Sequence, residues 1–409
     1  KDSPLISPMD TGLQTRINES ISEAYKENLT ADALMRLVND CLDQSPDRRI
    51  IHQLLDLAHI QSVAKTISKA KVTEEWLERV VQLIHLSQFH TGTMIEQRAK
   101  RYGDKTVFNM IHGNDLHTMS YSDLWSKIQM TGKALSVLDR SEKPSVIGLL
   151  TYNQLNGVLV DLACLSFGIR VIPIPLNSTS EHLSFILKQS EVTHIFVGGK
   201  TAIRLWNEVH HNHDILVIAL NDSSLIQGKV MDWEIFFENR DRSQNFDVDQ
   251  RLSYVSMDRT QTIMYTSGST ANPKGITFNQ NNIISKRFAR ALALPDFGSD
   301  DIFLCYLPLF HTFGRYFELM GSIFWGATYS FAESPAFNSL LKDFPIVNPS
   351  IFISIPKRWV QLYAMVEKQL DLDSEDIEPI ETKLKSITCE KLKLGCHLYT
   401  PDAADDTPQ

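Results

Sequence analysis

The chain has 409 residues, of which 43% are hydrophobic and 22% are charged, and its formal net charge is −9. A chain of this length predicts about two or three domains or sublobes. The acidic balance argues against a general nucleic-acid binder, because such proteins need a basic surface to displace counterions from phosphate. No uninterrupted apolar run approaches the roughly 18 residues of a membrane span, so the sequence predicts no transmembrane segment.

The cysteines and the first residues bear on the cellular compartment. The five cysteines are scattered and lack the spacing of a disulfide framework or a paired zinc site. Residues 1–4 carry no apolar signal-peptide core, so a reducing, cytoplasmic setting is predicted. The segment His210–Asp214 holds metal-ligand residue types without a second ligand group. A solvated turn is therefore favoured there, and no metal site is predicted.

Residues 1–88 are predicted to form a helical extension with almost no strand. Two stripes of apolar side chains recur at helical spacing, and the second follows a Thr73 cap and two glutamates. We expect these helices to pack on one another or on the main body, in preference to forming a dedicated docking module. The stripes consist of Leu34, Leu37, Val38, Cys41 and Leu42, and of Trp76, Val80, Leu83 and Ile84.

From Gly92 onward, short β-branched runs alternate with amphipathic segments. This alternation predicts an α/β fold with largely parallel sheets and right-handed crossovers. Helices are expected at residues 122–138 and 181–189. Strands are expected at residues 146–150, 171–174, 194–197, 215–220, 262–265, 302–306 and 351–355.

The main body is predicted to contain two α/β sublobes. We place the first at residues 89–250 and a partial second at residues 251–395, followed by a polar tail at 396–409. A weakly structured polar stretch at residues 227–258 marks the predicted boundary between the sublobes.

The segment Tyr265–Gly275 is predicted to grip phosphate. It follows a predicted strand, and ligands of α/β folds bind beyond the carboxyl ends of strands. Glycines permit backbone conformations that a Cβ resists, hydroxyls and amides bind anionic oxygens, and a lysine adds positive charge. The P-loop of kinases is excluded, because Pro273 and Gly275 flank the lysine. The candidate phosphate-binding residues are Thr266, Ser267, Gly268, Ser269, Thr270, Lys274 and Gly275.

This loop resembles the phosphate-binding signature of the adenylate-forming superfamily, which includes acyl-CoA synthetases and luciferases. Ala271 stands where the signature has a glycine. Two further segments, Tyr306–Arg315 and Ile353–Trp359, resemble the long-chain fatty acyl-CoA synthetase branch, and the likeness covers about residues 91–387. The resemblance implies an incomplete adenylate-forming large domain after the helical extension.

The resemblance also implies ATP, Mg²⁺ and coenzyme A as cofactors, and a fatty acid as substrate. A fatty acid would attack the α-phosphorus of ATP to give an acyl-adenylate and then a thioester with coenzyme A, while the loop and Lys274 hold the phosphates. His311 is implied to orient the carboxylate, although a lone histidine among aromatics is more often a packed core residue. Phe313, Tyr316 and Phe317 either line an acyl tunnel or belong to the core.

Several family elements that follow this region are not found in the sequence. They include a Tyr-Gly-x-Thr-Glu element and a small domain with a second lysine. We therefore expect impaired activation of long-chain fatty acids by these 409 residues. Two alternatives stay open, namely an inactive remnant that serves as a binding or interaction module, and adenylation for transfer to an acyl carrier protein.

Overall fold

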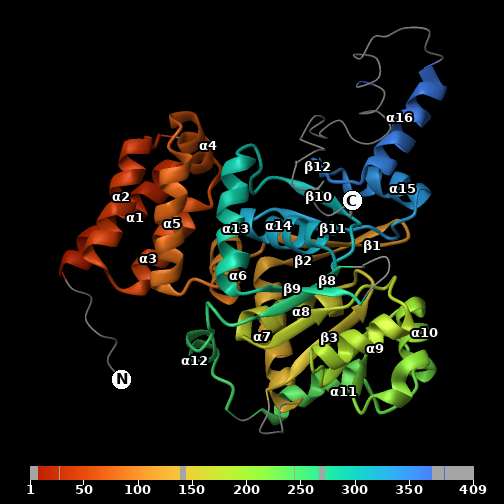
Figure 1. Cartoon of the computed structure of the whole chain (residues 1–409). Coiled ribbons are helices and arrows are strands. Elements are labelled where there is room, and N and C mark those ends of the chain that lie inside the picture. Colours follow the sequence, from red (N-terminus) through yellow and green to blue (C-terminus); the bar gives the residue numbers. More distant parts are fainter. Residues whose placement is uncertain are drawn as a thin grey trace.

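Figure 1 shows the computed structural model of the chain, which describes residues 8–26, 28–138, 144–243, 245–266, 272–370 and 382. Four candidate phosphate-binding residues, Ser267, Gly268, Ser269 and Thr270, lie outside the described residues, and so does the polar tail. The described part combines helices with two largely parallel sheets, which confirms the predicted α/β class.

The helical extension is present, and both predicted apolar stripes are largely buried in it. One detail of the prediction is wrong. Thr73 is the first helical residue of α5, and the N-cap is Val72, whose side chain cannot accept a hydrogen bond. The helices are α1 (Pro8–Tyr25), α2 (Ala31–Gln44), α3 (Arg48–Ala58), α4 (Gln61–Ala70) and α5 (Thr73–Ser87).

The extension packs on the main body through α4 and α5, which contact α13 (Figure 1). Ser68 Oγ in α4 donates a hydrogen bond of 3.1 Å to the carbonyl oxygen of Leu292. A single hydrophobic core joins the two parts, because buried side chains of the extension and of the body belong to one cluster. This arrangement agrees with the expected bundle packed on the main body.

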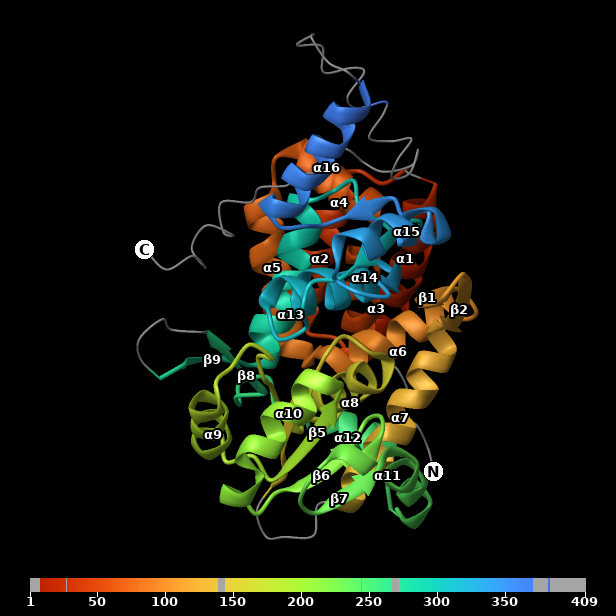
Figure 2. The same ribbon diagram turned by 90° about the vertical axis from the view of Figure 1, so that its right-hand side faces the viewer.

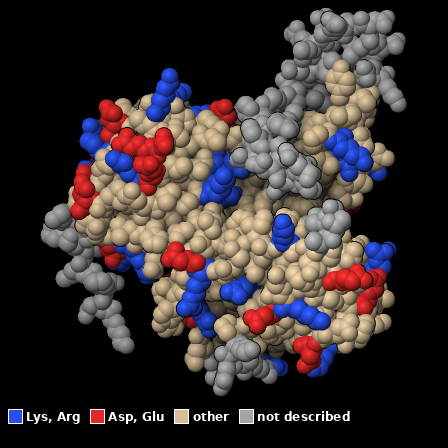
Figure 3. Space-filling model, in the orientation of Figure 1, with Lys and Arg blue, Asp and Glu red and all other residues tan. Residues whose placement is uncertain are grey.

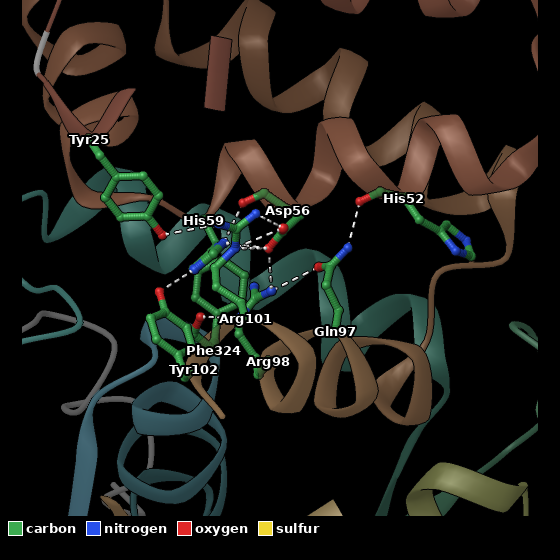
Figure 4. A network of polar contacts seen from close by, with 9 residues as sticks. All are labelled: Tyr25, His52, Asp56, His59, Gln97, Arg98, Arg101, Tyr102 and Phe324. Atoms are coloured by element: carbon green, nitrogen blue, oxygen red, sulfur yellow. Dashed lines mark hydrogen bonds and ion pairs between the residues drawn. The ribbon is translucent and has the colours of Figure 1, made fainter. Parts of the chain in front are cut away.

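A buried ionic network also fixes the extension to the body (Figure 4). Asp56 in α3 forms ion pairs with Arg98 and Arg101, which lie on α6 (Thr91–Tyr102). Arg98 Nε also donates to the carbonyl oxygen of Phe324, at 2.8 Å, in the main body. Burial lowers the pKa of His59 well below its ordinary value, so the neutral ring donates from Nδ1 to the Asp56 carbonyl.

Seven strands form the larger sheet, which lies in the lower half of Figure 2 with α9 and α10. Neighbouring strands are parallel except for β8 and β9, which form an antiparallel hairpin. In spatial order they are β7 (Val230–Asp232), β6 (Leu216–Ala219), β5 (His194–Gly198), β3 (Val146–Thr151), β4 (Arg170–Pro173), β8 (Thr262–Thr266) and β9 (Lys274–Phe278).

Five strands form the second sheet, and its only antiparallel pair within the described residues is β1 with β2. All seven predicted strands are found in the two sheets, although the last is shortened to two residues. In spatial order the five strands are β12 (Ile351–Phe352), β10 (Ile302–Cys305), β11 (Thr328–Phe331), β1 (Thr106–His112) and β2 (Asp115–Ser120).

The two sheets cross the predicted boundary near residue 250. Strands β1 and β2 precede it but belong to the same sheet as β10–β12, where β1 pairs with β11, while β8 and β9 follow it but extend the larger sheet. The division into domains therefore stays a prediction. The stretch 227–258 is also more ordered than expected, because it contains β7, α11 (Trp233–Glu238) and α12 (Val248–Ser253). Its aromatic side chains, such as Trp233 and Phe236, pack on one another.

The remaining helices cover the sheets, and both predicted helices of the body are among them. In the described part of the chain, no helix is long and apolar enough to cross a membrane. These helices are α7 (Tyr121–Leu138), α8 (Leu155–Phe167), α9 (Ser180–Gln189), α10 (Lys200–Val209), α13 (Gln280–Ala293), a π-helix (Phe313–Leu319), α14 (Met320–Trp325), α15 (Phe337–Val347) and α16 (Pro356–Leu370).

Candidate active site

The hairpin β8–β9 carries the predicted phosphate loop. Thr266 and Lys274 are opposite each other at its loop end, and both are exposed. Strand β8 runs parallel to β4, so the loop begins at the carboxyl edge of the larger sheet. The structure therefore brings together a hydroxyl and an ammonium group where ligands of α/β sheets bind.

Gly275 was predicted to permit a backbone conformation that a Cβ resists, but the structure shows that the space around it requires a glycine. It lies in the extended strand β9, and its φ angle is not in the left-handed region. A Cβ at this position would come within 2.8 Å of Ile263 Cγ2 and 3.1 Å of Tyr265 Cε1. The Tyr265 hydroxyl is hydrogen-bonded to Ser190 Oγ at 2.7 Å and to Gln189 at 2.9 Å, so its ring is fixed to α9. Gly275 thus lets the hairpin pack on an anchored ring.

His311 lies on the segment that follows β10. Its side chain is exposed, so the alternative interpretation of a buried core histidine is wrong. Its ring lies 4.7 Å from the Phe310 ring, measured between centroids. Asn153, directly after β3, positions the segment by donating to the Leu307 carbonyl at 2.8 Å and accepting from the Leu309 amide at 3.1 Å. This segment therefore lies against the carboxyl edge of the larger sheet.

Arg315 connects the His311 segment to the phosphate hairpin. Its side chain is 0% exposed and forms a bidentate ion pair with Asp161 of α8, with N–O distances of 2.5 and 2.9 Å. Its Nη1 donates to Thr262 Oγ1 of β8 at 2.8 Å. Burial opposes the charge of Arg315, but Asp161 more than compensates and raises its pKa above the ordinary value. Arg315 therefore has a structural role between the sheets.

Gly314 allows this segment to turn tightly. A Cβ on Gly314 would come within 2.3 Å of the Pro308 carbonyl oxygen and 2.5 Å of the Leu307 carbonyl oxygen. These are backbone atoms and cannot give way easily. A glycine is therefore required where the π-helix starts, three residues after His311.

A groove with a volume of about 680 Å³ opens between α5, β9 and α13. Tyr316 lines it, whereas Phe313 and Phe317 are not among the lining residues, and Phe317 packs beside Trp325. Only Tyr316 of the three predicted aromatics thus reaches this groove. The apolar lining consists of Leu77, Val81, Phe278, Ile283, Ala289 and Tyr316, and the polar lining of Thr277, Asn281, Asn282, Ser285, Lys286 and Arg287.

The predicted metal-ligand types at His210–Asp214 make other contacts. His213 Nε2 lies 3.2 Å from Ser184 Oγ, and Asp214 forms an ion pair of 2.6 Å with Lys229. Across the described ranges, no group of three or more His, Cys, Asp or Glu side chains is arranged to hold a metal ion.

Sequence reasoning missed three residues that shape the site: Asn153, Asp161 and Arg287. Asp161 and Arg287 carried a detectable signal, because each is a charged residue inside an apolar stripe. Asp161 interrupts the apolar helix α8, and Arg287 follows Ile283 and Ile284 at helical spacing and precedes Phe288. A charge on a buried stripe needs a partner, so such positions can be recognised in the amino-acid sequence alone. Asn153 carried no comparable signal.

Two curated relatives show the extent of the similarity. Long chain acyl-CoA synthetase 7, peroxisomal, of Arabidopsis thaliana is 26% identical over 251 residues, which are 60% of this chain and 35% of that protein. Long-chain-fatty-acid–CoA ligase ACSBG2 of Xenopus laevis is 21% identical over 278 residues, which are 66% of this chain and 37% of that protein. The chain thus spans about a third of the length of these relatives.

Solved structures agree on the fold. The complex of VinN with L-aspartate has a TM-score of 0.57 at 17% identity, with 74% of each chain covered. A benzoate CoA ligase from Burkholderia xenovorans has a TM-score of 0.56 at 16% identity, with 68% of this chain and 52% of that chain covered. At such low identities the likeness concerns the fold alone.

The AMP-binding enzyme family matches residues 95–389, which is more than half of the chain and includes the hairpin β8–β9 and the His311 segment. The fold, the hairpin and the relatives agree with this match. The chain belongs to the AMP-binding enzyme family.

Proposed function

We propose that the chain binds ATP at the hairpin β8–β9 and takes part in activating a carboxylic acid with a long apolar chain. The carboxylate attacks the α-phosphorus of ATP and expels pyrophosphate, and the resulting acyl-adenylate is converted to a thioester with coenzyme A. One observation carries the proposal: a groove with apolar side chains in half of its lining and the phosphate hairpin share strand β9. A single extended molecule can therefore reach both.

Thr266 and Lys274 fit the phosphates of ATP. Both are exposed at the hairpin's loop end, and a hydroxyl and an ammonium group are donors suited to anionic oxygens. Lys274 would hold the charge that leaves as pyrophosphate. When bound, Mg²⁺ supplies further charge neutralisation, and because it commonly binds through phosphates and water, it needs no dedicated cage of carboxylates. We assign no described residue to Mg²⁺ or to coenzyme A.

The acid would lie with its carboxylate near the hairpin's loop end and its chain along β9. His311 is exposed on the segment that Arg315 links to β8, so it is placed to orient a carboxylate. Tyr316 and Phe278, whose ring centroids are 5.1 Å apart, would contact the chain. The two reactants are anions, so positioning and charge neutralisation account for the rate, and no protein nucleophile is needed.

Two further observations support an acid with a long chain. Both curated relatives named above are described as enzymes for long-chain acids. The groove also has the size of sites that hold molecules of roughly 300–1,000 Å³, and half of its lining residues are apolar.

The experiment measures ATP binding by calorimetry and ATP–pyrophosphate exchange with palmitate or benzoate. We expect ATP to bind, and Lys274→Ala to weaken binding by about tenfold or more, because one charged contact is lost. Lys69→Ala is the matched control, since Lys69 is an exposed lysine on α4. Equal ATP binding by the wild type and Lys274→Ala would contradict the phosphate role.

The exchange assay separates the remaining possibilities. Exchange with palmitate that is lost in Lys274→Ala supports acid activation by this polypeptide. ATP binding without exchange supports the alternative of a binding module. Exchange with benzoate but not with palmitate would show that the long-chain assignment is wrong.

A further inference from the structure

The groove contains a buried cation that has no acidic partner in the described ranges of the chain. Arg287 lies on α13, is only 4% exposed and lines the groove. No ion pair to Arg287 is found among the described residues, and none of the residues that line the groove is acidic. A buried guanidinium without a carboxylate is unfavourable, so its retention calls for another source of negative charge.

Among the residues that the structure describes, the contacts of Arg287 leave most of its donors without a protein acceptor. Its Nε donates to the Ile283 carbonyl oxygen of the same helix at 3.2 Å. The guanidinium carbon lies 5.6 Å from the centre of the Tyr316 ring. A guanidinium has five N–H donors, and one backbone contact uses only one of them.

The surrounding charges are positive. Lys286 also lines the groove, and Arg290 follows one helical turn later. Burial, and then the charge of Arg290, lower the pKa of Arg287 to about 9, so the group still carries its proton at neutral pH. Figure 3 shows basic side chains over α13 on this face of the molecule. The groove is therefore an apolar site with a positive end.

Arg287 lies far from the loop end of the hairpin. It shares the groove with Phe278, which pairs with Thr262, whereas Lys274 pairs with Thr266 at the other end of β9. Four strand residues separate the two ends, which is about 13 Å at the rise of an extended strand. An anionic group bound by Arg287 would thus be separated from ATP phosphates bound near Lys274 by a distance that part of an acyl chain can span.

We propose that the acid activated at this site carries a second carboxylate at the far end of its chain, and that Arg287 binds this carboxylate. The substrate class is then a long-chain α,ω-dicarboxylic acid, in preference to a simple fatty acid. This inference rests on the proposed function, because it assigns one carboxylate to the hairpin and the other to the groove. Arg287 is a specificity-determining residue in this arrangement.

The test compares two acids of equal length, hexadecanoic acid and hexadecanedioic acid, by their displacement of a fluorescent fatty acid from the full chain. We expect the diacid to bind about tenfold or more tightly, as a charge-assisted bidentate contact would give. Arg287→Gln should bring the two affinities to within about threefold of each other. Arg287→Lys should restore part of the preference, because it restores the charge but not the fork geometry.

Arg204→Gln is the matched control, because Arg204 is an exposed arginine on α10 that does not line the groove. It should keep the preference for the diacid. The melting temperature of each variant checks that the fold is retained.

Two outcomes would overturn the inference. One is equal binding of the two acids by the wild type, and the other is an unchanged diacid preference in Arg287→Gln. Loss of ATP binding in Arg287→Gln would also overturn it, because the arginine would then hold a nucleotide phosphate. These results are distinct from failure of the proposed function, in which neither acid binds and ATP binding does not depend on Lys274.

Discussion

Two buried arginines contact the same tyrosine, Tyr316, but they differ in their polar partners. The guanidinium carbon of Arg315 is 5.4 Å from the Tyr316 ring centre, and that of Arg287 is 5.6 Å from it. Arg315 has a bidentate carboxylate, Asp161, and a hydroxyl, Thr262. Arg287 has its own helix carbonyl and an open groove.

The difference in polar partners indicates that the two arginines have different roles. A buried arginine with an internal carboxylate joins two parts of a fold, and here it joins the His311 segment to the phosphate hairpin. A buried arginine that lines a cavity without a carboxylate is a recognition group for an anion. These two roles can therefore be tested with variants that each remove one charged side chain.

Asp161→Asn should have the largest effect, because it leaves Arg315 charged and unpaired in the core. Breaking a buried ion pair from one side costs about 3 to 5 kcal/mol. Urea unfolding at pH 7.5 measures the loss. The double variant Asp161→Asn with Arg315→Met should recover a large part of the stability, since it removes both charges. A single variant as stable as the wild type would contradict the structural role.

Asp56→Asn extends the comparison to a carboxylate that two arginines share, Arg98 and Arg101. We expect a loss of about 3 kcal/mol, accompanied by faster hydrogen exchange in α1–α5, because Asp56 fixes the extension to α6. Asp40→Asn is the control. Its ion pair with Arg16 is at the surface, so its loss should cost less than about 1 kcal/mol. Unchanged exchange in the extension would disprove this role of Asp56.

Buried histidines differ from the buried arginines, because the imidazole ring avoids carrying a buried charge by losing its proton. Burial lowers the pKa of His90 to about 4. The contacts fit a neutral ring, since Nδ1 accepts from the Gly92 amide at 3.1 Å and Nε2 lies 3.0 Å from the Leu252 carbonyl oxygen. The unfolded state binds a proton near pH 6.5, whereas the folded state does not until about pH 4.

Stability should therefore fall as pH drops from about 6.5 towards 4, by about 2 kcal/mol at pH 5 for this one histidine. Urea unfolding at pH 7.5 and pH 5 measures the change, and His90→Gln should reduce the difference between the two pH values. If His90→Gln loses as much stability between pH 7.5 and pH 5 as the wild type does, His90 is not responsible for the pH dependence. His52, whose pKa burial also lowers to about 4, should contribute a similar slope.

The sequence identified the parts of the fold that have strong local patterns. Strands with β-branched runs, such as Val146–Thr151, were predicted, whereas β1, β2, β7, β9 and β11 were not. Strand β2 reads Asp-Leu-His-Thr-Met-Ser and is mostly exposed, so it carries little hydrophobic signal. It is a strand because β1 pairs with it, and such pairing is not written in a local pattern.

Only those parts of the site that consist of a continuous stretch of sequence could be predicted. The hairpin and the His311 segment are each continuous in the sequence, so motifs revealed them. The groove combines residues from α5, β9, α13 and the π-helix, which no window of the sequence brings together. The partner of Arg315 lies 154 residues away, at Asp161. A sequence can show that a buried charge needs a partner, but only the fold shows whether it has one.

Arg287→Met should have the smallest effect on stability and is the counterpart of Asp161→Asn. Removing an unpaired buried charge deletes a desolvation cost along with one hydrogen bond and one ring contact, so the change should stay within about 1 kcal/mol of the wild type. Urea unfolding without ligand measures it. Arg315→Met, which leaves Asp161 unpaired, is the control and should lose about 3 kcal/mol or more. A comparable loss in Arg287→Met would mean that this arginine also holds the fold together, and the distinction between the two arginines would fail.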